Sequence, residues 1–203
     1  MAERVLAPGD PGRALRLAQA LTDAPLMVNH ARGLWGYTGT AADGEPLTVQ
    51  STGLGGPSTA AIVRDLAVLG ARRVVRVGTC AALDRSLALG TLCAADPVLA
   101  LDGASRALGA GAQLRPTLPA AALTVITLAS TDLDDAPVLA SAHARDLSSA
   151  ALLSAASAAG IDAAGVVVVV ATDAAGARLG DEALHAAEIA LGRAALALLG
   201  GGL

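Results

Sequence analysis

Apolar and polar residues follow two patterns along this chain, one typical of strands and the other typical of helices. The continuous apolar run of five valines at 166–170 predicts a strand that is covered on both faces. In residues 57–70 the apolar positions are spaced three and four apart, which predicts a helix with one buried face. The two patterns alternate throughout, so we expect a three-layer α/β/α domain with a central mixed sheet.

Capping and turn residues set the expected limits of these elements. Asp10 and Pro11 fit the start of a helix that runs to residue 21, while Pro57 opens the second helix and Gly70 closes it. Further helices are expected at 146–160 and 180–199, and strands before Gly9, on both sides of the turn at 42–45, and at 72–78, 90–105, 122–130 and 164–173. Residues 103–121 are rich in glycine and proline and are expected to form a loop. We see no internal repeat and no domain boundary, so residues 1–203 are expected to form a single domain.

Composition narrows the chemistry. Hydrophobic residues make up 54% of the chain and there is no phenylalanine, so alanine, leucine and valine must build the core. All basic residues are arginines, which excludes lysine Schiff-base chemistry and a P-loop lysine. The guanidinium group suits phosphate and carboxylate because its donors meet such oxyanions in pairs. The net charge of −4 argues against a nucleic-acid partner.

The cysteines and apolar runs indicate a cytoplasmic protein. Cys80 and Cys93 do not form a Cys-x-x-Cys pair, so we expect free thiols in a reducing compartment. The first residues are charged and lack the apolar centre of a signal peptide. The run at 166–170 is too short to cross a bilayer, so no membrane partner is expected.

Two glycine-containing turns are candidate anion sites. Residues 53–56 (Gly-Leu-Gly-Gly) lie between a predicted strand and a helix, where backbone amides could hold an anion. The spacing departs from the dinucleotide pattern Gly-x-Gly-x-x-Gly, and the alternative is a plain strand-to-helix turn. Residues 9–11 repeat this layout with Arg13 in the first helical turn, where a cation is unfavourable unless an anion binds there. The alternative is that Arg13 is exposed to solvent.

Three further features carry candidate chemistry. Arg76 lies inside an apolar strand, where it must either form an internal ion pair or bind an anion together with Thr79. Asp173 is the last residue of the expected strand at 164–173 and fits either a general acid or a helix N-cap. The last helix carries Glu-x-x-His, but a second half of a metal site is missing. We therefore expect Glu182, His185 and Glu188 to form a solvated face and expect no metal.

The order of these motifs resembles the nucleoside phosphorylase family that contains the purine nucleoside phosphorylases and the uridine phosphorylases. The resemblance is carried by VLAPGDPGRA, VNHARGLWGYTGT, STGLGGPSTAAIVRDL, RRVVRVGTCAAL and VVVVVATD, which together span most of the chain. It implies cleavage of a purine nucleoside or uridine by inorganic phosphate, with no cofactor, to give a free base and a pentose 1-phosphate. DGAS at 102–105 is closer to the uridine branch, whereas the Asp173 motif is closer to the purine branch.

The resemblance also assigns residues to the site and implies a homodimer or hexamer. It implies catalytic roles for Asp173 and Arg76. It implies phosphate contacts from Gly9, Arg13, Arg32, Arg76 and Thr79, and sugar or base contacts from Leu54, Gly55, Cys80, Asp132, Leu147 and Ser148. Arg32 would be donated to the site of the neighbouring subunit.

The chain departs from the family pattern on the nucleoside side. Ser148 stands where the family has a sugar-binding glutamate, and a hydroxyl cannot hold two sugar hydroxyls as a carboxylate can. The segment between Asp132 and Asp146 is short, Leu133 replaces an expected aromatic residue, and Ala186 stands where purine members have an arginine. Two alternatives to a phosphorylase therefore stay open: a weakly active or inactive homologue that binds phosphate or a nucleoside-like ligand, and a nucleoside hydrolase.

Overall fold

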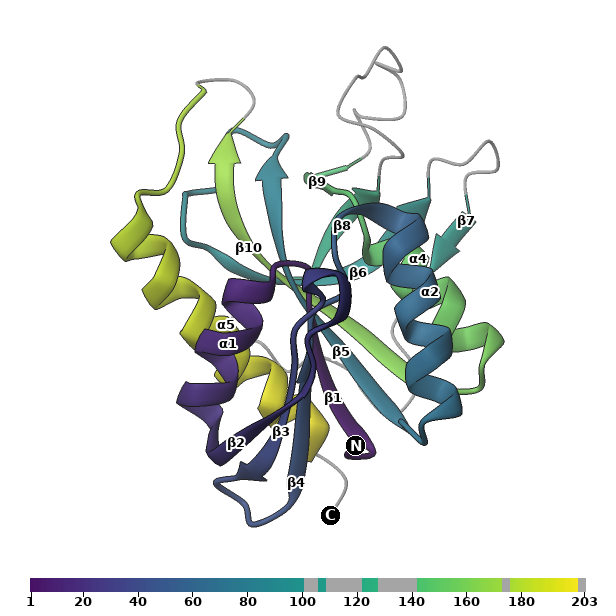
Figure 1. Cartoon of the computed structure of the whole chain (residues 1–203). Helices are drawn as coiled ribbons and strands as arrows, with labels where there is room; N and C mark the ends of the chain where they lie inside the picture. The colour runs from purple at the N-terminus through teal and green to yellow at the C-terminus, as the bar shows by residue number, and fades with distance from the viewer. Residues whose placement is uncertain (101–105, 109–121, 128–141, 173–175, 201–203) are drawn as a thin grey trace.

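The protein is described by a computed structural model that covers residues 1–100, 106–108, 122–127, 142–172 and 176–200 (Figure 1). Within these residues the strands are β1 (Arg4–Pro8), β2 (Thr22–Asn29), β3 (Gly36–Ala41), β4 (Pro46–Gln50), β5 (Arg73–Ala82), β6 (Leu92–Ala100), β7 (Arg106–Leu108), β8 (Ala122–Thr127), β9 (Ala144–Asp146) and β10 (Asp162–Thr172). The helices are α1 (Pro11–Leu21), α2 (Gly55–Val68), α4 (Ser149–Ala158) and α5 (Asp181–Gly200), with a 3-10 turn, η1, at Ala31–Gly33.

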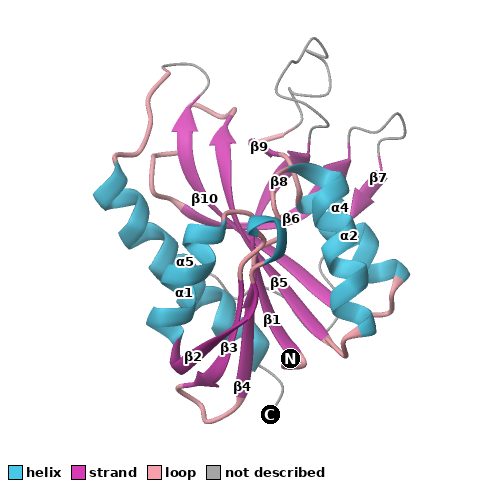
Figure 2. Cartoon of the chain, viewed as in Figure 1, coloured by secondary structure: helices cyan, strands magenta, loops and turns pink. Residues whose placement is uncertain are grey.

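The helices cover the two faces of one mixed sheet. Helices α1 and α5 lie on one face and α2 and α4 on the other (Figure 2). Each face has its own buried apolar cluster, one centred on Leu6, Leu17 and Leu191 and the other on Val63, Leu152 and Val167. Helices on both faces of one sheet confirm the expected three-layer α/β/α architecture. Both clusters consist almost entirely of aliphatic residues, as the composition predicted.

The central strands of the sheet are parallel and its edge is antiparallel. Strand β1 pairs in parallel with β4 and β5, and β5 pairs in parallel with β10. On the far side of β4, strands β3 and β2 continue the sheet in antiparallel fashion. On the other side, β5, β10, β6, β8 and β9 pair in a closed ring. The ring and the open sheet therefore share β5.

This arrangement brings three carboxyl-terminal strand ends to one place. Pro8 of β1 lies opposite Val77 of β5, and Thr79 of β5 lies opposite Val168 of β10. Ligands of parallel α/β sheets bind beyond such strand ends. The fold therefore presents the residues that follow Pro8, Val77 and Val168 to one site.

Several boundaries differ from the sequence-based expectation. Strand β5 runs four residues beyond the expected end because it stays paired with β10, so Thr79 and Cys80 lie on the strand and not in a turn. The helix expected at 146–160 begins at Ser149, because Asp146 is the last residue of β9, and β7 lies in the segment expected to be a loop. Helix α2 begins at Gly55, two residues before Pro57.

Helix α5 has the length and composition of a membrane span, and no other helix in the described part of the chain does. It packs on β5, β10 and β1, with Leu191, Ala195 and Leu199 fully buried. It also carries the buried acidic residue Glu188 on its inner side. These contacts are those of a core helix in a globular fold.

Candidate active site

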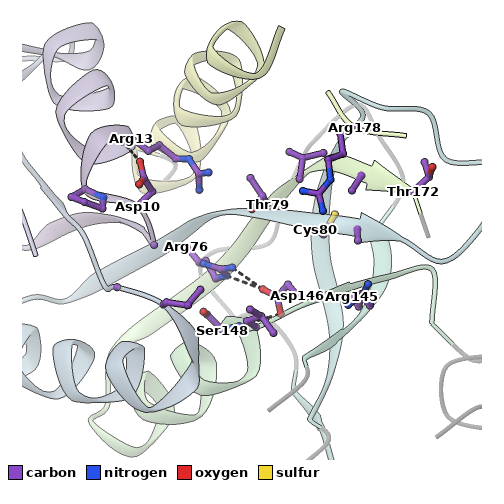
Figure 3. Close-up of a pocket in the computed structure, with 18 of the residues that line it drawn as sticks. Asp10, Arg13, Arg76, Thr79, Cys80, Arg145, Asp146, Ser148, Thr172 and Arg178 are labelled. Carbon is purple, nitrogen blue, oxygen red and sulfur yellow. Dashed lines mark hydrogen bonds and ion pairs between the residues drawn. The ribbon is translucent and has the colours of Figure 1, made fainter. Parts of the chain in front are cut away.

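A cavity of about 890 Å³ lies at the carboxyl ends of β1, β5 and β10 (Figure 3). Its walls come from the turn after β1, from η1, from the loop before α2, from β5, from the β9–α4 connection, and from the end of β10 with the segment that follows it. Five arginines and two aspartates contribute to the lining: Arg13, Arg32, Arg76, Arg145, Arg178, Asp10 and Asp146. The excess of guanidinium groups suits the cavity to an anionic ligand.

The turn after β1 places Arg13 at the cavity. The Asp10 carboxylate accepts a hydrogen bond from the Arg13 backbone N–H at 2.6 Å, and Pro11 stands in the first turn, as the sequence predicted. This cap fixes the start of α1, and Gly9 approaches the opposite loop closely: a Cβ on Gly9 would lie 3.2 Å from the Gly53 carbonyl oxygen. The backbone between Gly9 and Arg13 is thereby held against the cavity.

A carboxylate on the last helix holds the Arg13 side chain. Arg13 Nε donates to Glu188 Oε1 at 2.8 Å, and Arg16 Nη2 donates to Glu188 Oε2 at 2.6 Å. Arg13 is 8% exposed and Glu188 only 1%. The alternative of a solvent-exposed Arg13 is wrong. The expected solvated face is also wrong at Glu188, although Glu182 and His185 are exposed.

Arg76 forms the internal ion pair that the sequence left open. Its Nη2 and Nε donate to Asp146 Oδ2 at 2.8 and 3.0 Å, and Nε also lies 2.9 Å from Ser149 Oγ (Figure 3). Asp146 in turn accepts from the Ser149 backbone N–H at the start of α4. Arg76 lines the cavity while paired, so it contributes a fixed guanidinium and not a flexible cation.

Gly78 makes room for that guanidinium. A Cβ at this position would lie 2.7 Å from both Cζ and Nη2 of Arg76. Any larger residue would therefore push the Arg76 side chain away from Asp146. The glycine of the Arg-Val-Gly-Thr motif serves side-chain packing rather than a turn, because β5 continues through it.

The loop before α2 is fixed by its hydroxyl groups. Ser58 Oγ donates to the Thr52 carbonyl at 2.6 Å, and Ser51 Oγ donates to the Gly9 carbonyl at 3.0 Å. Gly53 has a φ of +75°, and a Cβ there would lie 2.6 Å from Ser58 Oγ. Glycine is required at this position both by conformation and by space.

The β9–α4 connection supplies Leu147 and Ser148 to the cavity. Ser148 is buried, and its backbone N–H donates to Asp146 Oδ1 at 3.3 Å. Within the described part of the chain its hydroxyl has no hydrogen-bond partner. The Ser148 hydroxyl is therefore available to a ligand.

The end of β10 forms the remaining wall. Val170, Ala171 and Thr172 line it together with Arg178 from the segment that follows. The Thr172 hydroxyl oxygen is completely buried and has no hydrogen-bond partner in the described residues. Asp173, the expected general acid, and Asp132 lie outside the described residues.

Cys80 lines the cavity as a neutral thiol. Burial raises its pKa well above the ordinary value, and the nearby Cys93 and Asp146 raise it further. Burial also raises the pKa of Cys93, to about 11. Because the thiolate is the reactive form of cysteine, Cys80 contributes shape and not nucleophilic chemistry.

The structure brings together most of the residues expected at the site. The expected contacts that line the cavity are Gly9, Arg13, Arg32, Arg76, Thr79, Leu54, Cys80, Leu147 and Ser148. Gly55 begins α2 and is not part of the lining. Arg32 lies in η1 with a φ of +56°, is exposed, and lines the cavity of its own chain.

Sequence reasoning missed three side chains that shape the site, namely Asp146, Glu188 and Arg178. Glu188 left a signal, because at 100° per residue it is turned about 120° from Glu182 and falls into the apolar stripe with Leu191. For Asp146, the apolar strand around Arg76 indicated either an ion pair or a bound anion, and it did not indicate which carboxylate would form the pair. The sequence did not predict that Arg178 lines the cavity, because its position depends on the main-chain pairing of Arg178 with Ala171.

Comparisons with known proteins agree with this geometry. Residues 3–138 match the family model described as the phosphorylase superfamily. A DeoD-type purine nucleoside phosphorylase of Oceanobacillus iheyensis is 40% identical over 88 residues, 43% of this chain and 37% of the relative. A uridine phosphorylase of Treponema pallidum is 40% identical over 102 residues, 50% of this chain and 39% of the relative. The aligned part is thus well under half the length of these curated relatives.

Solved structures extend the likeness of fold to nearly the whole chain. The uridine phosphorylase of Vibrio fischeri superposes with a TM-score of 0.82 at 22% identity, covering 98% of this chain and 91% of that one. The purine nucleoside phosphorylase of Toxoplasma gondii, solved with immucillin-H, gives 0.84 at 20% identity, covering 98% and 93%. The resemblance seen in the sequence motifs is confirmed, and the chain belongs to the phosphorylase superfamily.

Proposed function

We propose that this protein is a nucleoside phosphorylase. It cleaves the N-glycosidic bond of a purine nucleoside or uridine with inorganic phosphate and releases a free base and a pentose 1-phosphate. Phosphate is a co-substrate, no cofactor takes part, and the place of action is the cytoplasm. The names of the sequence relatives, purine nucleoside phosphorylase and uridine phosphorylase, support this assignment.

One observation carries the proposal, namely the convergence of Gly9, Arg13, Arg76 and Thr79 on one wall of the cavity. We call this wall the phosphate end. Two buried guanidinium groups, a hydroxyl and backbone amides there match the donors that a phosphate dianion requires. The part of the lining that comes from the end of β10 and the segment after it, namely Val170, Ala171, Thr172 and Arg178, is called the base end.

The mechanism assigned to this arrangement has three parts. Bond cleavage gives the sugar an oxocarbenium-like charge, and the phosphate at Arg13, Arg76 and Thr79 stabilises that charge and then bonds to C1′. The sugar lies between the two ends, against Leu54, Leu147 and Ser148. We assign to Asp173, from the sequence, the transfer of a proton to a purine base as it leaves.

Two other functions compete with this one. Ser148 stands where the family resemblance implies a sugar-binding carboxylate, and this favours a weakly active or inactive homologue that binds phosphate or a nucleoside-like ligand. The third candidate is a nucleoside hydrolase, but a hydrolase has no use for the phosphate end.

We propose a homodimer or hexamer in which Arg32 completes the site of the neighbouring subunit. Strand β2 is the edge of the sheet, and Leu26, Met27 and Val28 on it are 72%, 49% and 53% exposed. An exposed apolar edge strand is normally buried against another element or subunit, and a second copy of this chain would bury β2. Arg32 follows β2 directly, so an interface at β2 would bring it close to the partner's cavity.

Chromatographic assay of base release tests the proposed function. Purine and pyrimidine nucleosides are incubated with the protein in the presence and absence of phosphate. Release that requires phosphate identifies a phosphorylase, and equal release without phosphate identifies a hydrolase. If no nucleoside is cleaved while phosphate still raises the melting temperature, the protein is a binding homologue.

Mixing two inactive variants tests the donation of Arg32. In a mixed dimer of Arg32→Ala and Arg76→Ala chains, a donated Arg32 leaves one site complete, so co-expression restores roughly a quarter of the sites. If Arg32 acts within its own chain, every site lacks one arginine and the mixture stays inactive. Each variant alone is the control.

A further inference from the structure

Arg178 is fixed over the base end by main-chain pairing. After β10 the chain turns back, and the Thr172 N–H donates to the Ala177 carbonyl at 3.0 Å while the Leu179 N–H donates to the Val170 carbonyl at 2.9 Å. Arg178 itself forms an antiparallel bridge with Ala171. Its backbone is therefore held opposite a cavity residue, and Figure 3 shows its side chain reaching toward Cys80.

The guanidinium group of Arg178 differs from those of Arg13 and Arg76 in having no protein partner. Arg13 is paired with Glu188 and Arg76 with Asp146. Among the described residues Arg178 makes no side-chain hydrogen bond and no ion pair. A guanidinium group has N–H donors and no acceptor, so all the donors of Arg178 are available to whatever occupies the base end.

We propose that Arg178 donates hydrogen bonds to a carbonyl oxygen of the leaving base, so that the enzyme prefers nucleosides of oxo-bases over adenosine. The oxo-bases are uracil, hypoxanthine and guanine. This inference rests on the proposed function, because phosphate at Arg13 and Arg76 and sugar at Ser148 leave the base at the wall that carries Arg178.

The chemistry of the bond cleavage gives Arg178 a catalytic role. When the C1′–N bond breaks, its electron pair goes to the base, and a phosphate oxygen forms the new bond to C1′. An oxo-base spreads the incoming charge onto its carbonyl oxygen, where a guanidinium donor stabilises it more in the transition state than in the substrate. Adenine has an amino group at the corresponding position. Its N–H donors would face the N–H donors of Arg178, and no hydrogen bond could form between them.

The test compares substrates across matched variants. We measure kcat/KM for uridine, inosine, guanosine and adenosine at saturating phosphate with the wild type, Arg178→Met and Arg64→Met. Arg64 lies on α2, is exposed and is not part of the cavity lining, so its variant controls for the loss of one surface charge. Arg178→Met should lower kcat/KM about 10- to 100-fold for the cleaved oxo-base nucleosides and leave adenosine unchanged.

Two results would overturn the inference. One is a wild type that prefers adenosine, and the other is an equal loss on all four substrates in a folded Arg178→Met variant. If the wild type cleaves no nucleoside, the proposed function fails, and binding of the free bases decides the inference by itself. Stabilisation by uracil or hypoxanthine that is lost in Arg178→Met would uphold it, whereas no stabilisation of the wild type by either oxo-base would overturn it.

Discussion

The two ends of the cavity differ in how their arginines are held. At the phosphate end, Arg13 and Arg76 are buried and each is paired with a buried carboxylate. At the base end, Arg178 is exposed and unpaired within the described residues. A paired guanidinium keeps its position before the ligand arrives, whereas an unpaired one has all its donors to offer. The phosphate end is therefore preorganised, and selectivity should reside at the base end.

Breaking the Arg76–Asp146 pair should have the largest effect. Arg76→Ala leaves Asp146 buried without its cation, so unfolding by urea should show a loss of about 3–5 kcal/mol. Phosphate dependence should be lost as well. The double variant Arg76→Met/Asp146→Asn removes both charges and should recover stability without recovering phosphate binding. Unchanged phosphate kinetics in the folded double variant would refute the assignment of Arg76.

Glu188→Gln should weaken phosphate binding indirectly, through Arg13. The variant removes the charge that Arg13 and Arg16 share, which should cost about 1.5–3 kcal/mol of stability. Because Arg13 then loses its orientation, the KM for phosphate should rise about tenfold with a smaller change in the KM for nucleoside. Glu182→Gln, on the exposed side of the same helix, is the control. A fall in stability with an unchanged phosphate KM would reduce Glu188 to a purely structural residue.

Gly78→Ala should perturb the same end more gently. The added methyl group meets the end of the Arg76 side chain, which can move, so the loss of stability should be about 1 kcal/mol. The displaced guanidinium should nevertheless raise the KM for phosphate. Gly180→Ala is a matched control because a Cβ there meets no atom within 4 Å and the backbone needs no positive φ. Equal phosphate KM values in the two variants would contradict the packing role of Gly78.

Ser148→Glu should act on the nucleoside side and give the smallest change. A carboxylate can accept from two sugar hydroxyls where the serine hydroxyl meets one, so the KM for nucleoside should fall about threefold to tenfold. Ser148→Gln separates the length of the side chain from its charge. If Ser148→Glu folds and binds nucleoside no better, the serine is not what limits sugar binding.

Local sequence patterns were sufficient to predict the elements that build the phosphate end. The cap at Asp10, the apolar strand around Arg76 and the valine run of β10 each carry their structure within a few residues. Pairings between distant segments were not predictable in this way. Strand β9 is three residues long, and only its position between β5 and β8 makes it a strand. Likewise, the sequence around Arg13 does not indicate that Glu188 is its partner, and the sequence around Arg178 does not indicate that it pairs with Ala171.

The contact between Arg13 and Glu188 spans 175 positions, nearly the full length of the chain. Ribosomes make a chain from its N-terminus, so Arg13 emerges early and its carboxylate arrives almost last. Until α5 has docked, Arg13 lacks the partner that orients it, and contacts of such long range form slowly. A nascent or truncated chain that ends before Glu188 should therefore lack catalytic activity, even when β1, β5 and β10 have already assembled.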